Sequence, residues 1–154
     1  MTIEAADGNS TASPLMAAVR ELGAALEAFD EAAARALGVG RSDLRALNLL
    51  EHGPVAAGEL AGSLSLSSGA VTALVDRLEQ AGYVARVADP EDRRRVLVQL
   101  RPQTYAAFAR VYAPCGRAVS GVGHDLGPRS VATARRVLGA VAAAVREQER
   151  ALSG

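Results

Sequence analysis

Three consecutive arginines, Arg93, Arg94 and Arg95, follow the carboxylate of Asp92 between two short apolar segments. Guanidinium groups stay charged at every physiological pH and donate paired hydrogen bonds to phosphate oxygens. The plainer interpretation is a solvated charged turn. The position of the run at the tip of an expected hairpin favours contact with a nucleic acid by at least one of the three.

A second group of candidate contacts lies upstream, where small and hydroxyl-bearing residues begin an expected helix. Helix N-terminal N–H groups and hydroxyls bind phosphate, and small side chains allow close approach to base edges. The group consists of Ser67, Ser68, Gly69, Thr72 and Ala73. Some of these could instead be simple caps. Arg77, one turn further on, is either a phosphate clamp or an ion-pair partner of Asp76 or Asp89.

The elements that position these groups follow from hydrophobic periodicity. Val71, Leu74, Val75 and Leu78 predict a helix over about 68–81 that buries one face and ends at Gly82. Residues 83–88 and 96–100 predict two strands joined by a turn over 89–94. A helix followed by a charged hairpin is typical of a winged helix, whose helix enters a major groove while the hairpin reaches a flanking minor groove or the backbone.

Further helices are expected on both sides of this unit. Upstream, they cover about 43–51, capped by Ser42, and 56–64. The two terminal helices, about 14–37 and 129–152, have apolar residues spaced three and four apart, which predicts helix–helix contact. Between 102 and 128 the helical region should be kinked or interrupted at residues 114–123 and restarted at Gly127 and Pro128. The residues expected to interrupt it are Pro114, Gly116, Gly121 and Gly123.

We therefore expect a mainly α fold with a small β-hairpin wing: a winged helix-turn-helix domain flanked by N- and C-terminal dimerisation helices. Residues 1–13 are assigned to a disordered arm, 14–40 and 102–154 to a helical dimerisation region, and 41–101 to a DNA-binding winged helix. Formal charge is −4 over 1–40, zero over 41–101 and +4 over 102–154. The complementary ends agree with terminal helices that pack together.

Several classes of function have little support in the sequence. One cysteine and two histidines provide no metal site of ordinary spacing, and no catalytic motif or phosphate loop is present. We therefore predict no enzyme activity, no catalytic residues, no metal and no cofactor. The lone cysteine suits a reducing cytoplasm, and no apolar run is long enough for a bilayer, so a cytoplasmic protein without a membrane partner is expected.

Two segments of the centre resemble the MarR family of bacterial transcription regulators. Asp92-Arg93-Arg94 with Val98-Gln99-Leu100 fits the family's wing pattern, and residues 74–79 with 81–84 fit the end of its recognition helix. The resemblance implies a homodimer that reads a palindromic operator on double-stranded DNA. It also implies that Arg94 enters the minor groove while Asp92 holds it in place, which leaves Arg93 and Arg95 for phosphates. A nearby carboxylate lowers the cost of ordering a flexible guanidinium.

The expected function is thus a homodimeric transcriptional regulator, most simply a repressor released by a small anionic or apolar effector. The effector is expected between the terminal helices and the winged domain, with Arg20 or Arg45 pairing an anionic group. The alternative is a winged-helix module that binds another protein and no DNA, which the zero net charge of residues 41–101 favours. Salt dependence of binding separates the two.

Overall fold

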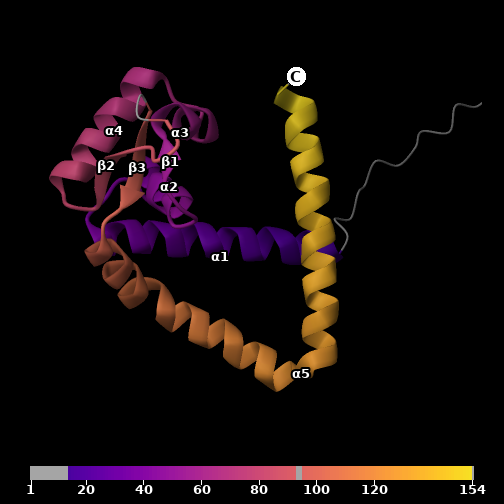
Figure 1. Cartoon of the computed structure of the whole chain (residues 1–154). Coiled ribbons are helices and arrows are strands. Elements are labelled where there is room, and N and C mark those ends of the chain that lie inside the picture. Colours follow the sequence, from indigo (N-terminus) through magenta and orange to yellow (C-terminus); the bar gives the residue numbers. More distant parts are fainter. Residues whose placement is uncertain (1–13, 93–94, 154) are drawn as a thin grey trace, which may run out of the picture. The chain divides into compact units, whose positions relative to one another are not determined.

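The computed structural model describes residues 14–92 and 95–153 of the chain (Figure 1). The predicted arm, residues 1–13, lies outside the described residues. Two compact units divide between Ala107 and Phe108. In chain order the elements are α1 (Pro14–Leu37), α2 (Arg41–Leu50), β1 (Val55–Ala56), α3 (Ala57–Leu64), α4 (Ser68–Gln80), β2 (Val84–Ala88), β3 (Val96–Leu100) and α5 (Pro102–Ser153).

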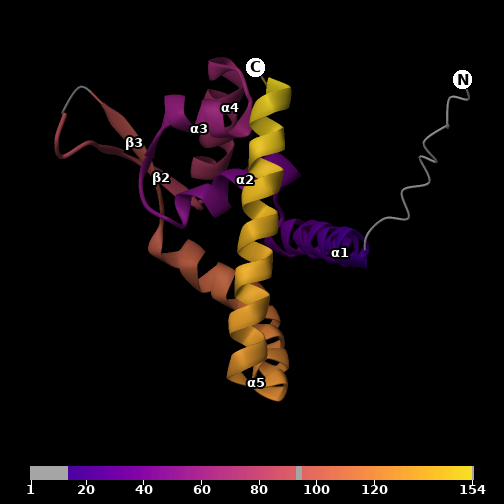
Figure 2. The ribbon, with the colours of Figure 1, turned by 90° about the vertical axis from the view of Figure 1, so that its right-hand side faces the viewer.

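The first unit contains a small antiparallel sheet in the order β1-β3-β2. The β2–β3 hairpin pairs Val84 with Leu100 and Ala88 with Val96, and Figure 2 shows it projecting away from α2, α3 and α4. The predicted mainly α fold with a hairpin wing is confirmed. The third strand, β1, was not predicted, because two residues after Pro54 are too few to show an alternating pattern.

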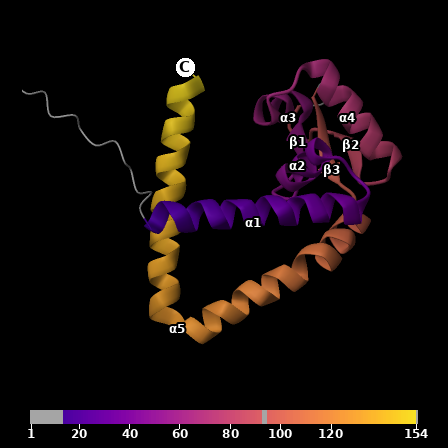
Figure 3. The same ribbon diagram turned by 180° about the vertical axis from the view of Figure 1, so that it is seen from behind.

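The core of this unit is built from Leu and Val side chains of α2, α3, α4 and the sheet. The predicted stripe of α4 is buried. The helix α4 lies against α3 and β2 (Figure 3). Val98 and Leu100 of β3, which share one face of the strand, are buried, whereas Val96 on the same face at the outer end of the hairpin is exposed. The largest fully buried core side chains are Leu44, Leu47, Leu50, Leu60, Val71, Leu74, Val75, Leu78, Val84 and Val98.

The start of α2 differs from the prediction. The helix begins at Arg41, so Ser42 lies inside the first turn and Gly40 occupies the cap position. The buried carboxylate of Asp43 accepts a hydrogen bond from the Gly40 N–H at 3.2 Å. A carboxylate in the first turn satisfies an otherwise unpaired N–H and favours the positive end of the helix dipole. Asp43, and not Ser42, therefore closes this helix start.

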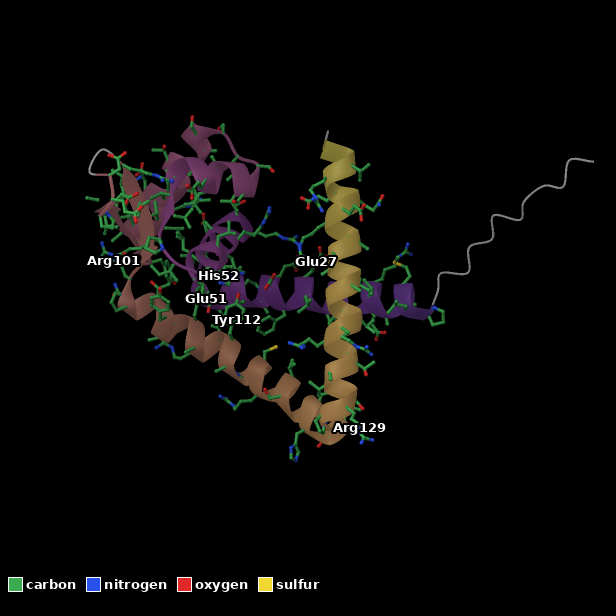
Figure 4. All side chains as sticks on the ribbon, turned by 45° about the vertical axis from the view of Figure 1, so that its right-hand side comes forward. Glu27, Glu51, His52, Arg101, Tyr112 and Arg129 are labelled. Carbon is green, nitrogen blue, oxygen red and sulfur yellow. The ribbon has the colours of Figure 1, made fainter. Side chains whose placement is uncertain are left out.

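Backbone-directed side chains join the hairpin to α5. Arg101, labelled in Figure 4, donates from Nε to the carbonyl of Val84 at 2.9 Å. The fully buried Thr104 donates from Oγ1 to the carbonyl of Tyr83 at 2.5 Å, and the Tyr83 hydroxyl donates to the carbonyl of Leu37. These bonds connect the base of the wing to the end of α1 and the first turn of α5.

The middle of α5 contradicts the predicted interruption. The helix continues through Pro114 and the glycines at 116, 121 and 123, and its non-helical residue is Gly127, at φ 77° and ψ 165°. A glycine inside a helix costs only about 1 kcal/mol, so isolated glycines do not by themselves end a long helix. The predicted restart at Gly127 and Pro128 is confirmed: glycine tolerates the positive φ, and proline fits the first turn of the next segment.

The two long helices carry large apolar side chains that are exposed in the single chain. On α1, the apolar residues spaced three and four apart are exposed at Leu15, Leu22 and Leu26 and buried at Ala33 and Leu37. Exposed apolar residues are Leu15, Met16, Leu22 and Leu26 on α1 and Val119, Val122, Leu126, Val131, Val137, Leu138, Val145 and Leu152 on α5. Within residues 14–92 and 95–153, no helix has both the length and the apolar character that crossing a membrane requires.

Candidate nucleic-acid interface

The first turn of α4 presents small and polar groups to solvent. Ser67 caps the helix, its Oγ accepting from the N–H of Ala70 at 3.3 Å, and Thr72 donates from Oγ1 to the carbonyl of Ser68 at 2.9 Å. Gly69 has open space where a Cβ would stand. As predicted, the exposed face contains Ser68, Gly69, Thr72, Ala73 and Asp76. This face can approach another molecule closely without moving a bulky side chain.

The turn of the hairpin is closed by its own backbone and by Asp89. The Asp89 N–H donates to the carbonyl of Arg95 at 3.0 Å, and the Arg95 N–H donates to the carbonyl of Asp92 at 2.8 Å. Asp89 also accepts the Glu91 N–H through Oδ1 at 2.9 Å. Residues 93–94 lie outside the described residues, so the role predicted for both arginines, and the hold of Asp92 on one of them, stays a prediction.

Arg95 is the described arginine of the run, and it faces carboxylates within the chain. Its Nη2 donates to Oε1 of Glu59 on α3, and its Nε lies 4.0 Å from Oδ2 of Asp89. The Arg95 side chain is about half exposed. The pair joins the outer end of β3 to α3, and a phosphate that binds Arg95 must compete with Glu59.

Arg77 pairs with a residue that the sequence did not indicate. Arg77 does not pair with either predicted partner, Asp76 or Asp89. Its guanidinium donates two hydrogen bonds to Asp43, from Nε to Oδ2 at 3.1 Å and from Nη2 to Oδ1 at 2.5 Å. The hydrogen bonds and the charge of Asp43 raise the pKa of Arg77. The prediction of Asp76 or Asp89 as the partner was wrong, because Asp76 pairs with Arg86 and Asp89 lies beside Arg95 in the fold.

Arg86 of β2 was missed by the sequence analysis. Its Nη2 donates to Oδ1 of Asp76 at 2.6 Å and its Nη1 to Oε2 of Glu79 at 2.5 Å. The Arg86 N–H donates to Oε1 of Glu79 at 3.2 Å. The hydrogen bond to Asp76, and to a smaller extent the bond to Glu79, raises the pKa of Arg86. In turn, the hydrogen bonds from the Arg86 backbone and side chain lower the pKa of Glu79. The available signal was an arginine on the strand that follows an acidic helix end.

The two arginines proposed for ligand binding lie in different settings. Arg45 lines a hollow of about 270 Å³ between α2 and α3, called here the α2–α3 hollow. The hollow is lined by Arg45, Asn48, Leu49, His52, Ser63 and Leu64. His52 follows Glu51 just beyond the end of α2, and both are labelled in Figure 4. Arg20 is exposed on α1 and does not line this hollow.

The order of the elements and the exposed face of α4 define a winged helix-turn-helix protein. Residues 44–96 match the model of the MarR family. The chain is 56% identical over 80 residues to an uncharacterized HTH-type transcriptional regulator, YcgE, of Bacillus subtilis, covering 51% of this chain and 52% of that protein. It is 33% identical over 72 residues to the HTH-type transcriptional repressor NicR of Pseudomonas putida, covering 47% and 45%.

Among solved structures, a MarR family protein from Bacillus stearothermophilus is similar along most of the chain. The TM-score is 0.69 at 25% identity, with 86% of this chain and 93% of that chain covered. Residues 44–96 of this chain are therefore similar to the MarR family, in agreement with the resemblance of the wing and helix motifs. The chain spans about half the length of the curated relatives it matches. Those relatives are named as transcription regulators and not as enzymes, in agreement with the prediction.

Proposed function

We propose that this chain is a homodimeric, sequence-specific DNA-binding transcriptional regulator that acts as a repressor released by a small ligand. The observation that carries the proposal is the exposed face of α4, which is free of bulky side chains from Ser68 to Ala73 and adjoins a hairpin with an arginine-rich tip. A helix with such a face fits a major groove, and the hairpin fits the flanking groove or backbone. The name of the relative NicR, a repressor, supports the direction of regulation.

Within this proposal, residues 41–101 bind DNA. Ser67, Ser68 and the first N–H groups of α4 meet phosphates, while Gly69, Thr72 and Ala73 lie against base edges. Thr72 donates to the Ser68 carbonyl, so its hydroxyl oxygen remains available to accept a hydrogen bond from a base. Arg94 enters the minor groove with Asp92 beside it, and Arg93 and Arg95 bind phosphates. Arg77 bonds to Asp43 and acts on DNA through the placement of α4.

Dimerisation is assigned to residues 14–40 and 102–154. The support is the apolar surface that both long helices expose in the single chain, including Leu22 and Leu26 on α1 and Leu138 and Val145 on α5. A soluble chain rarely leaves so many large apolar side chains in water, and a second copy supplies the matching surface in a two-fold dimer. Two copies of α4, about one helical turn of DNA apart, would then read two half-sites.

We place the effector in the α2–α3 hollow, in preference to the site expected from the sequence between the terminal helices and the winged domain. In the hollow, Arg45 can pair an anionic group while Asn48, His52 and Ser63 supply further polar contacts. The hollow borders α3, which packs directly against α4. A ligand there can therefore shift α4 only if it favours one placement of α3 over another. Linkage provides the check: saturating operator must weaken effector binding by the same factor by which the effector weakens operator binding.

A protein-interaction module without DNA binding is the second candidate. Its support is electrostatic, because residues 41–101 carry no net charge and Arg77, Arg86 and Arg95 all face carboxylates. Binding to a neutral protein surface would depend little on salt, whereas release of counterions from DNA gives a steep dependence.

The proposal is tested by selection of bound duplexes from a random-sequence library with the full chain. We expect a single family of palindromic sequences with two half-sites. Recovery of duplexes with no common sequence, at an affinity no better than that of the starting library, would contradict it.

A further inference from the structure

Arg86 stands between two carboxylates of the proposed recognition helix. Its two terminal nitrogens are divided between Asp76 at 2.6 Å and Glu79 at 2.5 Å, and its own N–H bonds to Glu79 as well. Three hydrogen bonds thus join β2 to the last turns of α4. The side chains of Arg86 and Glu79 are about one-third exposed, and that of Asp76 about half.

Asp76 occupies an unfavourable place for a protein that binds DNA. It is exposed and follows Thr72 by four residues, so it lies one turn further along the same face of α4. A carboxylate close to a DNA phosphate repels it. The small neutral residues on this face provide no positive charge to offset that repulsion. The face itself offers only small neutral residues, Ser68, Gly69, Thr72 and Ala73.

We propose that Arg86 is a counter-charge for α4: it offsets part of the negative charge of Asp76 and Glu79 so that the exposed face can approach DNA phosphates. This inference rests on the proposed function. It makes Arg86 a positioning residue that acts through two carboxylates, with no contact to DNA of its own. The net charge of the group Arg86, Asp76 and Glu79 is −1, against −2 without the arginine.

Two other roles make different predictions. If Arg86 bound a phosphate directly, it would use the N–H groups that remain on its guanidinium, because Nη1 and Nη2 each give one hydrogen bond to a carboxylate. If the ion pairs served folding alone, their loss would change the stability of the fold little, because exposed pairs contribute only about 0–1 kcal/mol. Asp76 could also read a cytosine through its N4 amino group, in which case neutralising Asp76 would weaken binding to one sequence.

The experiment compares six forms of the full chain: wild type, Arg86→Gln, Arg86→Lys, the double variant Asp76→Asn/Glu79→Gln, the triple variant that combines it with Arg86→Gln, and the control Arg41→Gln. Arg41 is matched in charge but pairs with Glu27 and Glu31 of α1, both at 3.6 Å. Fluorescence anisotropy measures affinity for a mixed-sequence duplex and for the selected duplex. Circular dichroism confirms that each form is folded.

We expect Arg86→Gln to weaken binding to both duplexes by about tenfold, the scale of one to two like-charge contacts in water. Arg86→Lys should stay close to wild type because it keeps the charge. The triple variant should recover to within about threefold of wild type, and Asp76→Asn/Glu79→Gln should bind at least as tightly as wild type. Arg41→Gln should change affinity by less than about threefold.

The rescue by the triple variant decides the proposal. A triple variant as weak as Arg86→Gln would show that Arg86 contacts DNA or sets the wing geometry, and would overturn the counter-charge role. An unchanged affinity in Arg86→Gln, or a loss in Asp76→Asn/Glu79→Gln confined to the selected duplex, would also overturn it. If the wild type itself binds neither duplex, the proposed function fails, and this inference fails with it.

Discussion

Arg77 of α4 and Asp43 of α2 stand 34 positions apart in the chain and meet in a two-point ion pair. The Asp43 carboxylate is buried, whereas the Arg77 side chain is more than half exposed. The same carboxylate accepts the Gly40 N–H at the start of α2. One side chain therefore closes a helix start and fixes the second half of α4 against α2, which makes the angle between these helices depend on it.

We predict that Asp43→Ala lowers the free energy of unfolding by about 1–2 kcal/mol, since it removes a helix-start acceptor and leaves Arg77 without its partner. Arg77→Gln should cost less, because Asp43 keeps its bond to Gly40 and its place near the positive end of α2. Urea unfolding monitored by circular dichroism measures both. Equal losses in the two variants would mean that the bond to Gly40 contributes nothing.

The pKa of Glu79 should depend on Arg86. Bonds from Arg86 lower this pKa below the ordinary value of 4.5, so the charged form is favoured in the folded chain. Its contribution to folding is therefore present above pH 4.5 and is lost as pH falls through the lowered value. NMR titration of the carboxyl carbon should show a higher Glu79 pKa in Arg86→Gln than in wild type. An identical pKa in both forms would remove Arg86 as the cause.

Dimerisation through the long helices predicts that Leu26→Asp weakens self-association. The Leu26 side chain is 54% exposed in the single chain, so the change should leave the winged unit folded while it places a charge in the interface. Sedimentation equilibrium should find a wild-type dimer at micromolar concentration and a shift toward monomer in the variant. A wild-type chain that is a stable folded monomer at that concentration contradicts the assignment.

The arginines of the wing should differ in what their removal changes. Arg94→Ala is expected to cost about 1–3 kcal/mol on the selected duplex, the range for a specific arginine contact. Arg95→Ala should weaken all sequences similarly and reduce the salt slope by roughly one charge per subunit; Arg93→Ala should behave alike. Affinities at several salt concentrations separate the two classes. Unchanged affinity in a folded Arg94→Ala variant would show the wing assignment to be wrong.

The sequence predicted elements more reliably than partners. The bounds of α1 and β3 and the buried stripe of α4 followed from spacing and from the flanking Pro14 and Gly38, because local periodicity and chain breakers act over a few residues. The break in α5 was placed too widely, since glycine composition does not show which glycine adopts a positive φ.

Ion pairs were the least predictable part of the candidate site. The partner of Arg77 lies on another helix, and Arg86 reaches α4 only because the hairpin folds beside it. Charge counts over residues 41–101 showed a balance but not its geometry. The resemblance of the wing and helix motifs indicated the family, and the fold showed that the two carboxylates beside the exposed α4 face, Asp76 and Glu79, pair with Arg86.

The most direct test of the central claim is the affinity of the wild-type chain for its selected duplex and for a shuffled duplex of equal composition, measured across a range of salt concentrations. We predict that the selected duplex binds at least about a thousandfold more tightly and that both affinities fall steeply as salt rises. Equal affinity for the two duplexes, or binding that does not change with salt, would contradict the account.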